Sequence, residues 1–153
     1  MNKEAQNPQL NIPAVSGSVF GHLMLDIETM GNESFSSIVS IGALEFDIET
    51  GKTGKEFYVN VDLQSCMDLG LIVNASTIMW WLNQNEQARK DLTDRTVLPI
   101  QKALLEFANF CNKDYQIWGN SARFDCGILQ MPTIKLVFLS LGILEKKDVL
   151  ERL

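Results

Sequence analysis

The sequence is poor in cysteine and has no long apolar run. Its 153 residues include three cysteines, Cys66, Cys111 and Cys126, and no Cys-x-x-Cys pair. An odd number of scattered cysteines supports neither a disulfide framework nor a zinc cluster, so we expect reduced, buried thiols. No stretch approaches the roughly 20 apolar residues that cross a bilayer, and the N-terminus lacks the pattern of a signal peptide. These absences predict a cytoplasmic protein without a membrane partner.

Positive charge is also scarce. The chain has 13 Lys and Arg against 19 Asp and Glu, a net charge of −6. This balance argues against a protein that grips nucleic acid through a broad basic face, but not against an enzyme that touches a strand end through metal ions. With 46% apolar residues, the chain can bury one core and is too short for two comfortable domains.

The first 18 residues are polar and contain Pro8, Pro13 and Gly17 without any sustained periodicity. We expect a flexible leader over 1–18, followed by a single domain over 19–153. Three strands are predicted next, at 22–27 (HLMLDI), at 37–46 (SIVSIGALEF) and around the alternating residues Phe57, Val59 and Val61. Turn residues at 47–54 predict an antiparallel meander, with the first strand in a central position.

Two amphipathic helices and a further strand and helix follow. Asn74 or Ser76 can cap a helix whose apolar face holds Ile78, Met79, Trp81 and Leu82, with a polar, solvated continuation over 83–91. Pro99 opens a second helix, with apolar residues spaced by three and four from 100 to 111. A brief strand at 115–118, a turn at 119–122 and a helix from Phe124, interrupted at Pro132, complete the pattern.

Acidic residues stand where the first strand and the last helix meet their loops. The period of two places Asp26 and Glu28 on one side of the strand, with Ile27 directed to the core. Hard Mg²⁺ or Mn²⁺ would neutralise such a pair, because these ions take carboxylate oxygens. An Asp-x-Glu tripeptide is also common at exposed strand ends. Asp125 can supply a third ligand or merely cap the helix N-terminus.

Aromatic residues and the only histidine offer fewer clues. Trp80 and Trp81 can stack on nucleic-acid bases, or Trp81 can belong to the core. His22 precedes the first strand, which favours a surface position at the strand start.

Five sequence blocks together resemble a known family: LDIETMG, SIVSIGALEFD, STIMWWLNQNEQAR, LPIQKALLEF and IWGNSARFDCGIL. In this order, over about 23–129, they resemble the phage and prophage 3′-to-5′ exonucleases of the DEDD superfamily, the exonuclease VIII-like group. The resemblance implies an α/β, ribonuclease-H-like fold with a mixed β-sheet flanked by α-helices. It makes Asp26 and Glu28 the first motif and Asp125 the second, and these three the catalytic and metal-binding residues.

The implied activity is Mg²⁺- or Mn²⁺-dependent hydrolysis of phosphodiester bonds at the 3′ end of single-stranded DNA or RNA, by a two-metal mechanism that releases nucleoside monophosphates. Thr29 and Met30 would lie beside the terminal nucleotide, and the turn of Trp118, Gly119 and Asn120 would support the site. The expected substrate-binding residues are Thr29, Met30, Trp80, Trp81 and Asn120.

The tail departs from the family pattern. Family members end in a motif with a histidine general base and a last aspartate, and this chain reaches Leu153 with neither. Family members carry the short motifs Asn-Ala-Tyr and Pro-Trp in this part of the chain. Residues 130–133 and 140–145 can be encoded by codons that, read in another frame, give these motifs. We therefore expect a truncated or frameshifted C-terminal part after about Gln130. The activity would then be impaired, and the alternative is an inactive nucleic-acid or nucleotide-binding remnant. An uncovered sheet edge would also favour a homodimer.

Overall fold

A five-stranded sheet is the framework of the structure, a computed structural model that describes residues 20–93 and 96–140. The expected leader over 1–18 and the tail from 141 lie outside these residues. The strands are β1 (His22–Thr29), β2 (Ile38–Phe46), β3 (Thr53–Val61), β4 (Val97–Leu98) and β5 (Gln116–Gly119). The helices are α1 (Leu63–Asp68), α2 (Ala75–Leu82), α3 (Glu86–Thr93), α4 (Ile100–Phe110) and α5 (Ala122–Ser140).

The sheet is mixed, with the strand order β4-β3-β2-β1-β5. β1, β2 and β3 pair antiparallel, which confirms the predicted meander. β5 joins β1 in parallel and β4 joins β3 in parallel. β1 therefore has a partner on each side, as its apolar sequence predicts, and the mixed sheet flanked by helices is the predicted ribonuclease-H-like α/β fold.

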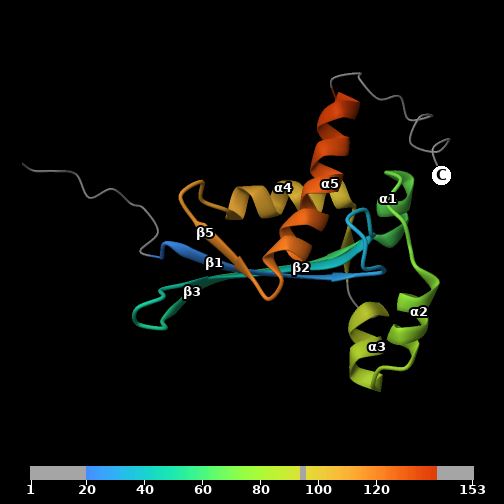
Figure 1. Cartoon of the computed structure of the whole chain (residues 1–153), viewed down its shortest axis with the longest axis horizontal. Helices are drawn as coiled ribbons and strands as arrows, with labels where there is room; N and C mark the ends of the chain where they lie inside the picture. The colour runs from blue at the N-terminus through green and yellow to red at the C-terminus, as the bar shows by residue number, and fades with distance from the viewer. Residues whose placement is uncertain (1–19, 94–95, 141–153) are drawn as a thin grey trace, which may run out of the picture.

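Alternation along β1 gives the sheet a buried and an open side. Leu23, Leu25 and Ile27 are at most 6% exposed, whereas Asp26 and Glu28 lie on the exposed positions between and beyond them. Figure 1 shows α4 and α5 on one side of the sheet and α2 and α3 on the other. We call the side that carries Asp26 and Glu28 the open face.

The core lies between the sheet and the helices α4 and α5. Ile100 and Ala103 of α4 and Ile128 and Leu129 of α5 join the buried cluster that contains Leu25. Each aliphatic side chain buried in this way contributes about 1.5 to 3 kcal/mol, so this side holds most of the apolar stabilisation. The spacing of three and four predicted for α4 is thereby confirmed.

Several local features differ from expectation. α1 was not predicted; it begins because the Asp62 carboxylate accepts a hydrogen bond from the backbone N–H of Ser65, at 2.9 Å. The polar segment after α2 forms a separate helix, α3. The interruption expected at Pro132 was wrong: α5 runs through it, and Pro132 is fully buried, so packing of its ring offsets the lost backbone hydrogen bond.

The apolar face expected on α2 is not part of the core. No residue of α2 is buried, and Ile78, Met79 and Leu82 are between 39% and 58% exposed. Their spacing does match one face of a helix, but that face meets a pocket instead of packed side chains. No helix among the described residues has the length and apolar character needed to cross a membrane.

The cysteines are unpaired thiols, as predicted. Cys66 is buried, and this burial raises its pKa to about 11. Cys111 and Cys126 are only partly buried, so the expectation of burial is confirmed for one thiol of the three.

Candidate active site

Two carboxylates project from the end of β1 on the open face. Asp26 lies opposite Gly42 of β2, and Glu28 lies opposite Ser40. Neither carboxylate has a hydrogen-bond or ion-pair partner among the residues that the structure describes. An unpaired acid of this kind is available to a ligand or to water.

A third acid approaches from α5. Because β5 runs parallel to β1, the helix that follows β5 begins near the end of β1. Asp125 lies in the first turn of this helix and is 4% exposed, and its Oδ2 accepts a long hydrogen bond of 3.4 Å from the backbone N–H of Ser121. The sequence left two alternatives for Asp125. Its carboxylate accepts this N–H at the start of the helix and also interacts electrostatically with Asp26 and Glu28.

The acids interact electrostatically. Burial, followed by repulsion from Asp125, raises the pKa of Asp26. Burial raises the pKa of Glu28 as well, with repulsion from Asp26 and then Asp125 adding to it. The structure thus places the three acids that the sequence singles out near enough to interact electrostatically, and the repulsion on Asp26 and Glu28 favours a cation.

The donor set suits a hard cation, although the side chains do not form a ready-made site. Within residues 20–93 and 96–140, no three His, Cys, Asp or Glu side chains converge closely enough to hold a metal ion. Carboxylate oxygens are the ligands that Mg²⁺ and Mn²⁺ prefer. Asp26 and Glu28 are exposed, and no described residue holds either carboxylate away from such an ion.

The turn after β1 is fixed by hydrogen bonds from three directions. The buried Thr29 donates its hydroxyl to the carbonyl of Gly31 at 2.5 Å, and the Trp81 indole Nε1 donates to the carbonyl of Thr29 at 3.0 Å. The backbone N–H of Met30 donates to Ser37, at 2.9 Å, and its carbonyl accepts from Asn74, at 2.7 Å. Thr29 therefore shapes the turn, while the Met30 side chain lines a pocket next to it.

An apolar pocket of about 430 Å³ opens next to this turn. We call it the apolar pocket; its lining includes Met30, Val73, Ile78, Trp81, Leu82 and Leu92. Trp81 is half-buried and meets Trp80 edge to face, with ring centroids 4.9 Å apart, and Trp80 is 55% exposed. The two tryptophans thus differ: Trp81 is anchored in the pocket wall and Trp80 faces solvent.

A smaller pocket of about 200 Å³ adjoins Glu28. We call it the polar pocket; its lining includes Glu28, Ser40, Tyr58, Asn60, Trp81 and Asp91. Ser40 and Asn60 were missed from the sequence. The available signal was a polar residue between apolar neighbours, Ser40 between Val39 and Ile41 and Asn60 between Val59 and Val61.

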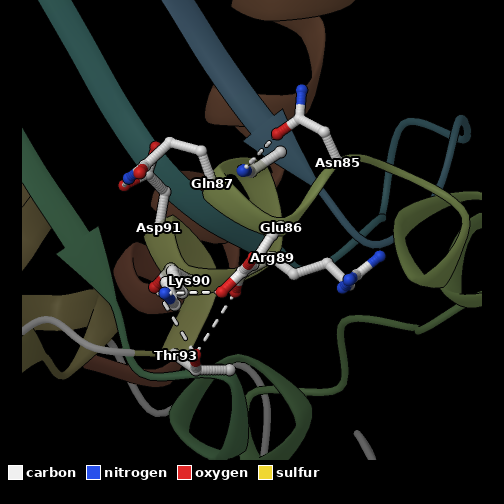
Figure 2. Close-up of polar contacts among 8 residues, drawn as sticks. Asn85, Glu86, Gln87, Arg89, Lys90, Asp91 and Thr93 are labelled. Carbon is white, nitrogen blue, oxygen red and sulfur yellow. Dashed lines mark hydrogen bonds and ion pairs between the residues drawn. The ribbon is translucent and has the colours of Figure 1, made fainter.

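The roof of the polar pocket is α3, which is held by its own polar contacts. Figure 2 shows Gln87 and Asp91 on one side of this helix and Arg89 on the other. Gln87 donates to Asp91 at 3.0 Å, and Lys90 pairs with Glu86 at 2.7 Å. These contacts, one helical turn apart, support a short helix that has no buried residue.

His22 lies away from the acids, whereas Asn120 directly follows Gly119, the β5 partner of Leu25, which precedes Asp26. His22 begins β1, as expected, and its Nδ1 accepts a hydrogen bond from Trp118 Nε1 at 3.0 Å. Four residues of extended strand, about 13 Å, separate it from Asp26. Asn120 is exposed in the turn between β5 and α5.

A comparison with known families matches most of the chain. A family model described as the 3′-5′ exoribonuclease Rv2179c-like domain matches residues 21–142, about four fifths of the chain. The matched range contains the three acids and both pockets. No curated protein matches the chain.

Proposed function

Because the chain belongs to the family of Rv2179c-like 3′-5′ exoribonuclease domains, we propose that it hydrolyses single-stranded RNA from the 3′ end by a two-metal mechanism. The five sequence blocks support a finer placement in the DEDD superfamily, near the phage exonuclease VIII-like group. The observation that carries the proposal is the placement of the three acids from two distant segments: Asp26 and Glu28 share one side of β1, and Asp125 lies in the first turn of the helix that follows the parallel strand β5.

Asp26, Glu28 and Asp125 would hold Mg²⁺ or Mn²⁺ through their carboxylates. Bound there, a divalent cation would supply an activated water and offset the charge of the phosphate. The acids themselves hold this charge-rich centre at the end of β1, and the hydrogen bond from Ser121 keeps the Asp125 carboxylate near the start of α5.

The remaining residues position the strand. We assign the 3′-terminal base to the apolar pocket, between Met30 and Trp81, since flat aromatic bases stack on such surfaces without sequence preference. Trp80 offers an exposed ring for the next base. Asn120, in the turn that leads to Asp125, is assigned a contact with the phosphate backbone. Thr29 acts indirectly, because its hydroxyl closes the turn that carries Met30.

One observation favours a second candidate, an inactive binding remnant. The only histidine of the chain, His22, is at the far end of β1 and is engaged by Trp118, so it does not reach the acids. A histidine base accelerates proton transfer by about 10²- to 10⁴-fold, so its absence from the acids would leave binding intact and turnover slow.

The test is the shortening of a 5′-labelled single-stranded RNA in Mn²⁺, followed on a sequencing gel. We expect a ladder that shortens one nucleotide at a time and disappears with EDTA and in Asp26→Asn. Asp114→Asn is the matched control, because Asp114 is an exposed acid in the turn before β5. Intact RNA with normal RNA binding would establish the binding remnant instead, and an Asp26→Asn enzyme as active as Asp114→Asn would refute the assignment of the acids.

A further inference from the structure

A row of three polar residues, Glu28, Ser40 and Asn60, crosses the open face from β1 to β3. Cross-strand pairing sets Glu28 opposite Ser40, and Ser40 opposite Asn60. All three line the polar pocket. With strands about 4.8 Å apart, the row spans about 10 Å from the acid of β1 to the amide of β3. It is a carboxylate, a hydroxyl and an amide in sequence along the pocket floor.

We propose that this pocket binds the ribose of the 3′-terminal nucleotide and that Asn60 recognises its 2′-hydroxyl. The inference rests on the proposed function, since it takes the acids at Glu28 as the place of the reacting phosphate. It deepens that function by naming the residues that select RNA over DNA.

Hydrogen-bonding capacity in the pocket matches a sugar. The Ser40 hydroxyl has no hydrogen-bond partner among the described residues, although Ser40 is only 4% exposed. Asn60 Oδ1 accepts from the Tyr58 hydroxyl at 3.1 Å, so the Asn60 amide directs its N–H donors elsewhere. A ribose hydroxyl both donates and accepts, so it can satisfy Ser40 and the Asn60 amide together.

Charge argues for the sugar over the phosphate. The described lining of the polar pocket includes Glu28 and Asp91 but no Lys, Arg or His. A phosphate group is bound through cations or convergent N–H groups, and beyond the proposed metal ligand Glu28 the described lining offers no cation. A neutral group that hydrogen-bonds to Ser40 and Asn60 suits that part of the pocket better.

The neighbouring apolar pocket supplies the rest of the nucleotide. Trp81 and Leu92 line both pockets, so one wall separates the two spaces. The Trp81 indole is pinned to the Thr29 carbonyl, which fixes this wall next to the acids. A bound nucleotide would therefore span the wall formed by Trp81. Its sugar would lie on the Ser40 side, its base on the Met30 side and its phosphate toward Asp26.

The experiment compares three oligonucleotides of one sequence: all-RNA, RNA with a 2′-deoxy sugar at the 3′-terminal nucleotide, and RNA with that sugar at the penultimate position. Removing one hydroxyl that pairs with a desolvated amide lowers kcat/KM for the first cleavage about tenfold. We expect this loss only for the terminal substitution in the wild-type chain. In Asn60→Ala, the ratio of kcat/KM for all-RNA to kcat/KM for the terminal 2′-deoxy substrate falls to about one. In Asn109→Ala, which changes an exposed asparagine of α4, this ratio stays at the wild-type value.

Asn60→Asp guards against a folding defect, because it keeps the oxygen that accepts from Tyr58 and loses the N–H donors. A tenfold ratio that survives in both Asn60 variants, or a wild type that ignores the terminal 2′-hydroxyl, overturns the proposal. Titration with AMP and with 2′-deoxy-AMP in EDTA, followed by NMR shifts of the Asn60 and Ser40 amides, is independent of turnover. If no RNA is shortened, the proposed function fails. The ribose pocket is still supported if the chain binds AMP more tightly than 2′-deoxy-AMP and Asn60→Ala removes this preference. Equal binding of AMP and 2′-deoxy-AMP to the wild-type chain refutes the pocket.

Discussion

Replacing Trp81 by phenylalanine should destabilise the domain far more than the same change at Trp80. The two residues are neighbours on α2 and both carry an exposed edge, but only Trp81 donates a hydrogen bond, at 3.0 Å to the carbonyl of Thr29. A hydrogen bond of this kind contributes about 0.5 to 1.5 kcal/mol net. The smaller ring also gives up part of the contact with the pocket wall, so the expected loss is about 1 to 2 kcal/mol.

For a domain of this size, 1 kcal/mol corresponds to about 4 °C in Tm. Trp81→Phe should therefore lower Tm by about 4 to 8 °C, as measured by far-ultraviolet circular dichroism in EDTA. Trp80→Phe is the control: Trp80 is 55% exposed, and its replacement should stay within about 0.5 kcal/mol, or 2 °C. Equal losses in the two variants would show that α2 is not tied to β1 through the indole.

Three further outcomes follow from the structure. Burial and neighbouring acids raise the pKa of Asp26 and Glu28, so ionisation of these acids destabilises the fold above their unfolded-state pKa. Asp26→Asn should therefore leave Tm unchanged near pH 3 and raise it at pH 7 in EDTA, and an equal shift at both pH values would contradict this sign. Asp125→Asn should reduce RNA shortening at least about 100-fold with little change in Tm, measured as initial rates beside a thermal scan. Gly51→Ala should lower the free energy of unfolding by about 1 kcal/mol, measured as a lower urea midpoint, because Gly51 has a φ of +67° that L residues rarely adopt. Steric crowding does not contribute, since no atom lies within 4 Å of a new Cβ at Gly51. Gly21→Ala is the control, because Gly21 has equal space and no positive φ, and it should leave the midpoint unchanged.

The meander of β1, β2 and β3 could be predicted because its signals are local. Apolar alternation and a turn over 47–54 determine the pairing of neighbouring strands, and the register follows from which residues must face the core. α4 was equally clear, since its apolar spacing is regular from Ile100 onward. By contrast, β4 has two residues and α1 six, too few for any periodicity to show.

The acids could be found from the sequence, but the pockets could not. Asp26 and Glu28 share a strand, so their common side is fixed by the period of two. Ser40 and Asn60 come from two other strands, and only the pairing register shows that they stand in one row with Glu28. The apolar face of α2 was correctly predicted, but what covers it was not, because periodicity shows that a helix has an apolar face and not which part of the molecule that face contacts.

The parallel pairing of β1 with β5 also determines when the acids meet. It joins His22 with Gln116, across most of the described chain, whereas each strand of the meander pairs with its immediate neighbour. Closing so long a loop costs more conformational entropy than closing a hairpin, so we expect this contact to form after the local ones. During synthesis the ribosome releases Asp26 and Glu28 well before Asp125. A growing chain therefore carries two of the three acids without the third, and the charge cluster appears only once α5 has emerged and docked.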